Sequence, residues 1–330
     1  MSMGATILLF AALCAIPWIG VTLFGMHTLF GVVIPYIAWA LFVGGVVCRV
    51  LYWVKAPVPF CIPTTCGQQR SLSWIKPARI DNPFTDGAVF IRMLLEVLCF
   101  RSLFRNTRSE LMGGPRLTYY MEKWLWLAAL AFHWSFLVVV LRHLRFFLEP
   151  TPAWLVILQY LDGFFEYSLQ AVFASGVVIL LSVTYLFLRR VMLPDIRYIS
   201  LPADYFPLLV IEGIVVTGLL MRYFIRVDII AVKQLALGLA TFHPAAPTAL
   251  SSLFYIHLFL LCVLISYFPF SKLMHMGGVF LSPTRNMANN SRAVRHVNPW
   301  DYPVHVHTYA EYEDEFRDKM KGAGLPVDKE

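Results

Sequence analysis

Four of the nine histidines lie inside long apolar stretches, where a polar side chain needs a specific reason. His133 and His143 share residues 121–148, and His257 and His275 share residues 249–276. An unpaired polar group in hydrocarbon costs several kcal/mol, so a single histidine there usually bonds to a neighbouring helix. Two pairs on two stretches instead indicate metal ligation. Two neutral imidazoles on one haem iron make a saturated centre suited to electron transfer rather than oxygen binding.

The spacing of these histidines predicts which ones pair. On a helix, ten residues separate His133 from His143 by about 15 Å, and eighteen separate His257 from His275 by about 27 Å. Eighteen residues return to the same helix face, whereas ten leave an angle of about 80°. The orientation argued below makes residues 121–148, the third membrane span, run outward and residues 249–276, the sixth, run inward. Depth then pairs His143 with His257 at an outer haem iron, and His133 with His275 at an inner one. We therefore expect two haem b groups stacked across the membrane.

Cationic side chains lie beside both expected haems and could bind their propionates. Arg142 and Arg145 flank the outer site, and Lys272 lies one turn from His275 at the inner site. Ordinary snorkelling to the membrane interface explains these three cations equally well.

Carboxylates at the depth of the outer haem are candidates for a quinone site. Asp162 and Glu166 could accept protons from a quinol, although helix capping or an interfacial position explains them equally well. Glu212, inside the fifth span, is a further candidate for proton handling or for a buried hydrogen bond.

The hydrophobic composition of the chain indicates that these histidines lie on membrane helices. Hydrophobic residues make up 58% of the 330, charged residues 14%, and the mean hydropathy is +0.65. A bilayer core needs roughly 20 apolar residues per crossing. The sequence predicts an all-α integral membrane protein, a bundle of about six transmembrane helices around a di-haem b core. The expected spans are residues 5–25, 28–54, 121–148, 164–188, 204–226 and 249–276.

The distribution of Lys and Arg predicts the orientation of the bundle. Twenty-one of these residues fall in the loops on one face and at the C-terminus, against five on the other face. The positive-inside rule therefore places both termini in the cytoplasm, in a multi-pass protein of the inner (cytoplasmic) membrane. The net charge of +7 is concentrated where lipid headgroups and protein partners lie, so it gives no reason to expect a nucleic-acid partner.

The chain divides into four parts. Residues 1–54 form two N-terminal transmembrane helices, 55–120 a cytoplasmic loop, 121–281 a four-helix di-haem cytochrome b domain, and 282–330 a cytoplasmic tail. Within the loop, residues 86–105 are predicted to form an amphipathic helix that lies flat on the inner leaflet or docks a partner, with Arg92, Arg101 and Arg105 available to phosphates. The polar tail has no apolar face large enough for its own core, so we expect a partner to order it.

The histidine spacing resembles that of a known family. Phe132 and His133 followed by His143, and His257 followed by His275 at the end of the run FPFSKLMH (268–275), are similar to the haem-ligand pattern of the membrane-bound nitrate reductase gamma subunit family. The resemblance covers the third to sixth spans. Those relatives place a lysine near the quinol, and residues 149–175 contain none.

The sequence of the cytoplasmic loop resembles one particular kind of subunit within that family. The runs CIPTTCGQQR (61–70) and DNPF (81–84), with the extra N-terminal span, are similar to the cytochrome b subunit of the sulfite-reduction-associated membrane complex. The resemblance implies menaquinol or menaquinone as substrate and electron exchange with a cytoplasmic iron-sulfur subunit like that of heterodisulfide reductases. It also implies a periplasmic multihaem cytochrome and further membrane and iron-sulfur subunits. We expect the loop 55–120 and the C-terminal tail to contact the cytoplasmic iron-sulfur subunit.

The expected function is that of an electron-transfer subunit of a quinol-linked oxidoreductase complex in dissimilatory sulfur metabolism, rather than of a stand-alone enzyme. One alternative keeps the haems but changes the complex to a nitrate reductase, hydrogenase or formate dehydrogenase. A second alternative is a haem-free membrane anchor or transporter whose histidines only pack.

Overall fold

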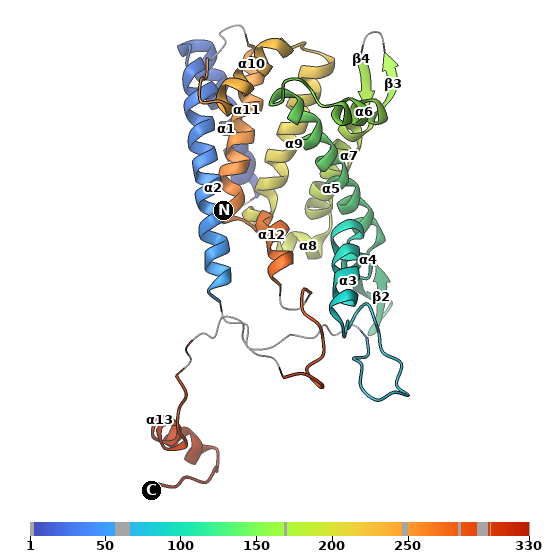
Figure 1. The fold of residues 1–330 in the computed structure, drawn as a ribbon, viewed down its shortest axis with the longest axis vertical. Helices are drawn as coiled ribbons and strands as arrows, with labels where there is room; N and C mark the ends of the chain where they lie inside the picture. The colour runs from blue at the N-terminus through green and yellow to red at the C-terminus, as the bar shows by residue number, and fades with distance from the viewer. Residues whose placement is uncertain are drawn as a thin grey trace.

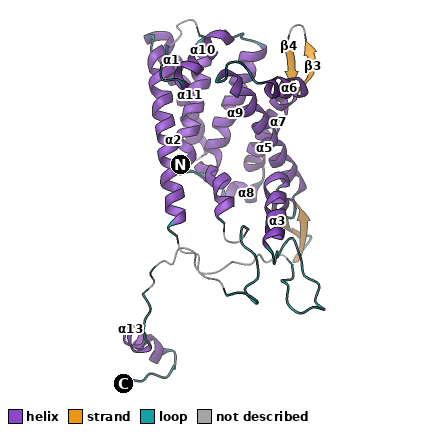
Figure 2. Cartoon of the chain, in the orientation of Figure 1, coloured by secondary structure: helices purple, strands orange, loops and turns teal. Residues whose placement is uncertain are grey.

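The computed structural model shows a long bundle of helices (Figure 1), and most of its chain is helical (Figure 2). It describes residues 3–56, 67–167, 170–245, 250–282, 285–295, 303 and 305–329, and the side chains of residues 166, 167 and 170 are outside the description. The Cys61 and Cys66 motif falls outside these residues. Among the described residues, six helical stretches are long and apolar enough to cross a membrane, which agrees with the predicted number: Met3–Phe24, Leu29–Val54, Lys123–Phe146, Ala174–Met192, Pro202–Tyr223 and Ser252–Phe270.

The elements that form these stretches pack into a four-helix core with two helices added to one side. The core contains α5 (Lys123–His143), α7 (Ala174–Met192), α9 (Pro202–Tyr223) and α11 (Ser252–Tyr267), with α5 against α7, α7 against α9 and α9 against α11. Both α1 (Met3–Phe24) and α2 (Ile34–Val54), which follows a π-helical turn (η1, Leu29–Val33), pack against α11. The outer surface of the bundle is apolar, as in a protein whose solvent is lipid.

Short elements cap the two ends of the bundle. One end, which we call the α6 end, carries η2 (Leu144–Phe146), α6 (Ala153–Asp162), the hairpin of β3 (Gly163–Tyr167) and β4 (Gln170–Phe173), and α10 (Ile229–Ala240). The opposite end, the α3 end, carries α3 (Asp86–Cys99), α4 (Arg101–Phe104), α8 (Pro194–Ile199) and the hairpin of β1 (Thr107–Met112) and β2 (Arg116–Met121). The two hairpins are additions to the predicted all-helical fold.

The loops predicted to share a face do lie at one end. At the α3 end, Arg108 of β1 pairs with Asp195 of α8 at 3.0 Å, and Arg189 at the end of α7 pairs with Glu122 at 2.7 Å. Further along this end, Asn289 joins the chain after the sixth span to the loop before α3, because its side chain donates to Asn82 at 2.7 Å and its backbone N–H donates to the carbonyl of Pro83.

The fourth span begins ten residues later than predicted. Residues 164–173 are mostly apolar and aromatic, a composition that suits a strand as well as a helix. Their described part forms strands β3 (Gly163–Tyr167) and β4 (Gln170–Phe173) instead.

The sixth span is also different, because it ends before His275. Helix α11 stops at Tyr267 and is followed by η3 (Phe268–Phe270), an extended Ser271, η4 (Lys272–Met274), α12 (His275–Gly278) and η5 (Val279–Leu281). Pro269 cannot donate a helical hydrogen bond, and the Ser271 hydroxyl caps η4 instead. The argument that placed His257 and His275 on one face of one helix is therefore wrong.

The loop helix and the tail also differ from prediction. The expected helix 86–105 breaks at Phe100, whose φ is +49°, into α3 and α4, and Arg92 is buried rather than available to lipid phosphates. In the tail, α13 (Tyr309–Gly322) begins with a capping box formed by Thr308 and Glu311. Glu313 of α13 accepts the backbone N–H groups of Asp328 and Lys329, so this short unit is folded on itself.

Candidate functional site

The first histidine pair lies toward the α3 end of the bundle. The ring centroids of His133 on α5 and His275 on α12 are 6.0 Å apart, with their planes at 79°. An iron bonded to two imidazoles at about 2 Å each places the ring centroids about 6 Å apart, on rough bond-length arithmetic. The separation therefore suits one iron between the two rings.

Both rings of this pair are oriented by backbone carbonyls. The Nδ1 atom of His133 lies 2.7 Å from the carbonyl oxygen of Ala129, and that of His275 lies 2.8 Å from the carbonyl oxygen of Lys272. A carbonyl only accepts, so Nδ1 carries the proton in each ring and Nε2 presents a lone pair. This is the tautomer that a metal ligand requires.

The second pair, at the α6 end, uses the same tautomer. His143 donates through Nδ1 to the carbonyl of Val139 at 2.7 Å. The Nδ1 atom of His257 lies 2.9 Å from the hydroxyl of Thr217, which itself donates to the carbonyl of Gly213 at 2.7 Å. Because that hydroxyl hydrogen is used, the Thr217 oxygen accepts from Nδ1 of His257. His143 is the last residue of α5 and His257 lies near the start of α11, so both rings belong to the α6 end of the bundle.

Thr217 and Gly218 are contributions that sequence reasoning missed. A Cβ atom at position 218 would lie 3.3 Å from Cε1 of His257, so glycine lets α9 approach the ring closely. The available signal was Thr217 itself, one of few polar residues in an apolar helix.

Arg142 and Arg145, the cations predicted for the outer site, have partners at the α6 end. Arg142 pairs with Asp162 at 2.6 Å and lies 3.3 Å from the ring centroid of Phe173, while Arg145 donates to Gln159 at 3.1 Å. Arg222, not singled out from the sequence, stacks on the other side of Phe173 at 3.9 Å, and its buried Nε has no hydrogen-bond partner among the described residues. Among the described side chains here, three guanidinium groups and one carboxylate leave a positive excess that suits carboxylates of a ligand.

The two carboxylates proposed for a quinone site, Asp162 and Glu166, both lie at the α6 end. Asp162 is buried, pairs with Arg142, and accepts from the backbone N–H and the hydroxyl of Ser175 at 2.8 and 2.6 Å. This network caps the start of α7 and engages both oxygens of the carboxylate. Glu166 lies in β3 opposite Ala171, and its side chain is outside the description.

Two other candidates have structural partners. Lys272 pairs with Asp204 of α9 at 2.8 Å and its side chain is 72% exposed. Glu212 accepts from the hydroxyl of Thr184 at 2.6 Å, which joins α9 to α7 inside the bundle.

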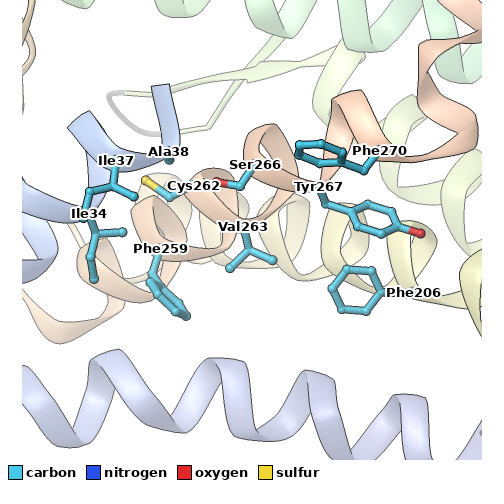
Figure 3. Close-up of a pocket in the computed structure, with 10 residues that line it drawn as sticks. All are labelled: Ile34, Ile37, Ala38, Phe206, Phe259, Cys262, Val263, Ser266, Tyr267 and Phe270. Atoms are coloured by element: carbon cyan, nitrogen blue, oxygen red, sulfur yellow. The ribbon is translucent and has the colours of Figure 1, made fainter. Parts of the chain in front are cut away.

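An apolar pocket lies apart from the histidines. It has a volume of about 440 Å³ between α2, α9 and α11, and Figure 3 shows its lining, which includes Cys262, Ser266 and Tyr267. None of the predicted site residues lines it, so it adds no group to either histidine pair.

Comparison with known proteins gives the family of the chain. Residues 96–296 match the nitrate reductase gamma subunit family. The Hdr-like menaquinol oxidoreductase cytochrome b-like subunit of Archaeoglobus fulgidus is 45% identical over 280 residues, which cover 83% of each chain. The protein of the same description from Archaeoglobus profundus is 45% identical over 276 residues, which cover 81% of each chain. The chain therefore belongs to the nitrate reductase gamma subunit family, as a multi-pass membrane protein of the cytochrome b-like type.

Proposed function

We propose that this chain is a di-haem cytochrome b subunit that exchanges electrons between menaquinol and a cytoplasmic iron-sulfur partner. The observation that carries the proposal is the presence of two histidine pairs at two levels of one bundle, each ring with Nδ1 engaged and Nε2 left for a metal. When bound, the two haem b groups would supply reversible one-electron transfer.

The residues of the chain have distinct tasks in this proposal. His133 and His275 hold the inner haem, and His143 and His257 hold the outer one. Arg142 and Arg145 bind carboxylates at the outer haem, with Arg222 added beside them, and Lys272 adds positive charge near the inner haem. Asp162 holds Arg142 in place and, with Glu166, remains the predicted place of quinol proton transfer.

We also propose the setting of the subunit. Because its relatives are described as parts of Hdr-like menaquinol oxidoreductases, we assign the chain to a complex with a heterodisulfide reductase-like iron-sulfur subunit in dissimilatory sulfur metabolism. The iron-sulfur subunit would contact the loop 55–120 and the tail, and a periplasmic multihaem cytochrome would belong to the same complex. Copurification of a molybdenum enzyme with the tagged chain, instead of an iron-sulfur protein, would reject this setting.

The test of the core proposal is the haem content and redox behaviour of the purified chain. We expect two haem b per chain, and reduction of both by a menaquinol analogue. A folded, colourless preparation would reject the di-haem function in favour of a haem-free anchor or transporter.

A further inference from the structure

Helix α3 has the polarity of its two faces reversed. Its outward side chains are large and apolar, with Phe90 65% and Ile91 52% exposed, whereas Arg92 and Glu96 are buried, at 3% and 8%. A helix on the surface of a water-soluble protein shows the opposite pattern. The helix stands beside α5 (Figure 1), and the indoles of Trp134 and Trp126 donate to the carbonyls of Leu98 and Cys99 at its end. The protein-facing side of α3 therefore supplies charge to the interior of the α3 end.

The buried face of α3 belongs to a cluster of charges, which we call the α3 charge cluster. Asp81 pairs with both Arg101 and Arg105. Glu96 pairs with Arg285 at 2.8 Å and accepts the backbone N–H of Ser102 at 3.1 Å. With Arg92, the cluster consists of Asp81, Arg92, Glu96, Arg101, Arg105 and Arg285. Four guanidinium groups face two carboxylates, so two positive charges are unmatched within it.

Arg92 is the least satisfied member of the cluster. Its Nη1 atom is buried and has no hydrogen-bond partner within the part of the chain that the structure describes. Burial lowers the pKa of its guanidinium, with Glu96 opposing that effect. A buried cation without a full set of partners is costly, so this position favours an anionic ligand.

The α3 charge cluster adjoins the His133 and His275 pair. The ring of Phe100, the residue at the end of α3, meets the ring of His133 edge to face at a centroid distance of 4.9 Å. Ser102, two residues further on, accepts a hydrogen bond from Nη1 of Arg285 at 2.9 Å. Phe100 therefore contacts the ring of His133 next to the segment in which Ser102 contacts Arg285.

We propose that Arg92 and Arg285 bind the two propionate carboxylates of the haem held by His133 and His275. This inference rests on the proposed function and adds the residues that fix the edge of the inner haem. The two unmatched charges equal the charge of two propionates, and a guanidinium forms paired hydrogen bonds with a carboxylate. Lys272, the cation predicted for this role, is mostly exposed and already paired with Asp204.

The test is an Arg92→Gln variant of the full chain, studied by redox titration with the two b-type components resolved. Loss of the positive charge should lower the midpoint potential of the component lost in a His133→Ala variant and leave the other unchanged. The affinity of the chain for that haem should fall about tenfold, as expected for the loss of one hydrogen bond between charged groups. Arg92→Lys should restore part of the potential. Arg108→Gln, at the same end but paired with Asp195, is the matched control and should behave as the wild type.

A second measurement isolates the carboxylates and does not depend on the folding of the variant. Haem dimethyl ester lacks both carboxylates, so the haem-free wild-type chain should retain it at the inner site more weakly than it retains haem b. The Arg92→Gln variant should lose less on the same exchange, because only the Arg285 contact remains to be lost. Unchanged potentials in folded Arg92→Gln, equal shifts of both components, or loss of bound phospholipid with unaffected haem would each overturn the inference. A wild-type chain with two haems would leave the proposed function intact in those cases, whereas a wild-type chain with none would reject both.

Discussion

The two histidine pairs are held in different ways at the two ends of the bundle. At the α6 end, His143 and His257 lie on regular membrane helices, and the hydroxyl of Thr217 on a neighbouring helix orients His257. At the α3 end, His275 follows a break in the helix, and both rings bond only to carbonyls of their own segments, at Ala129 and Lys272. At the α6 end one ring, that of His257, is thus oriented by a neighbouring helix, whereas at the α3 end both rings are oriented by their own segments.

The ion pairs beside the two sites show a similar contrast. Arg142 and Asp162 at the α6 end are 15% and 6% exposed, whereas Lys272 at the α3 end is 72% exposed. A buried pair is strongly destabilised when one partner is removed, but an exposed pair contributes little. The Arg142–Asp162 pair should therefore contribute more to stability than the Lys272–Asp204 pair.

The largest expected effect comes from replacing single histidines. His143→Ala and His257→Ala should remove the same haem, and His133→Ala and His275→Ala should remove the other, because each iron needs both of its imidazoles. The haem-to-chain ratio should fall from two to one, as measured by pyridine haemochrome spectra. His243→Ala, which alters an exposed histidine at the α6 end, is the control and should keep both haems. Loss of the same spectral component from His143→Ala and His275→Ala would break the pairing.

The next effect concerns stability. Asp162→Ala leaves Arg142 buried without its partner and removes the cap of α7, so it should cost about 3–5 kcal/mol. Lys272→Met, at the exposed pair, should cost at most about 1 kcal/mol. Denaturant unfolding of the purified chain in detergent measures both. Similar losses for the two variants would show that the ends do not differ in this way.

A smaller effect should follow from Thr217→Val. The variant keeps the shape of the side chain but leaves Nδ1 of His257 without its acceptor, so haem affinity at the α6 end should fall about 10- to 100-fold. Competition with a haem-binding apoprotein measures this affinity. Thr184→Val, which removes a hydroxyl bonded to Glu212 instead of to a histidine, should leave haem affinity unchanged. An equal response of the two variants would mean that Thr217 only packs.

The smallest effect concerns pH at the α3 end. Burial raises the pKa of Asp81, but hydrogen bonds and charges of Arg101 and Arg105 outweigh it and hold the pKa below the ordinary 3.8. Since the folded pKa is the lower one, this carboxylate stabilises the loop above pH 3.8 and loses that effect as the pH falls through the folded value. Hydrogen exchange in residues 67–85 should therefore rise only in strong acid. Asp81→Asn should already show the faster exchange at pH 7, and exchange independent of this variant would contradict the assignment.

Much of the fold could be predicted because lipid imposes a simple length rule on apolar stretches. Five spans begin within a few residues of their predicted starts. The rule failed for the β3–β4 hairpin, where an apolar run forms its backbone hydrogen bonds between strands instead of within a helix. It also failed at Pro269 and Ser271, which end a helix inside an apolar sequence. Hydrophobicity alone does not separate these cases.

The site was less predictable than the spans. Depth alone anticipated that His133 would lie beside His275, although the helical geometry used for His275 was wrong. Arg92 was placed against lipid because sequence periodicity gives the two faces of α3 but not which face turns inward. Arg222 and Thr217 depend on contacts between distant segments, which a single sequence does not show.

The helix break before His275 is held by contacts with α2, the second N-terminal span. Nε of Arg49 donates to the carbonyl of Pro269 at 3.1 Å, and a Cβ atom at Gly45 would lie only 2.7 Å from Cβ of Pro269. Helix α2, which precedes the family match, thus supports the bend that carries His275, one of the proposed haem ligands. A chain shortened to the matched region would keep the geometry of His143 and His257 while losing the support of His275.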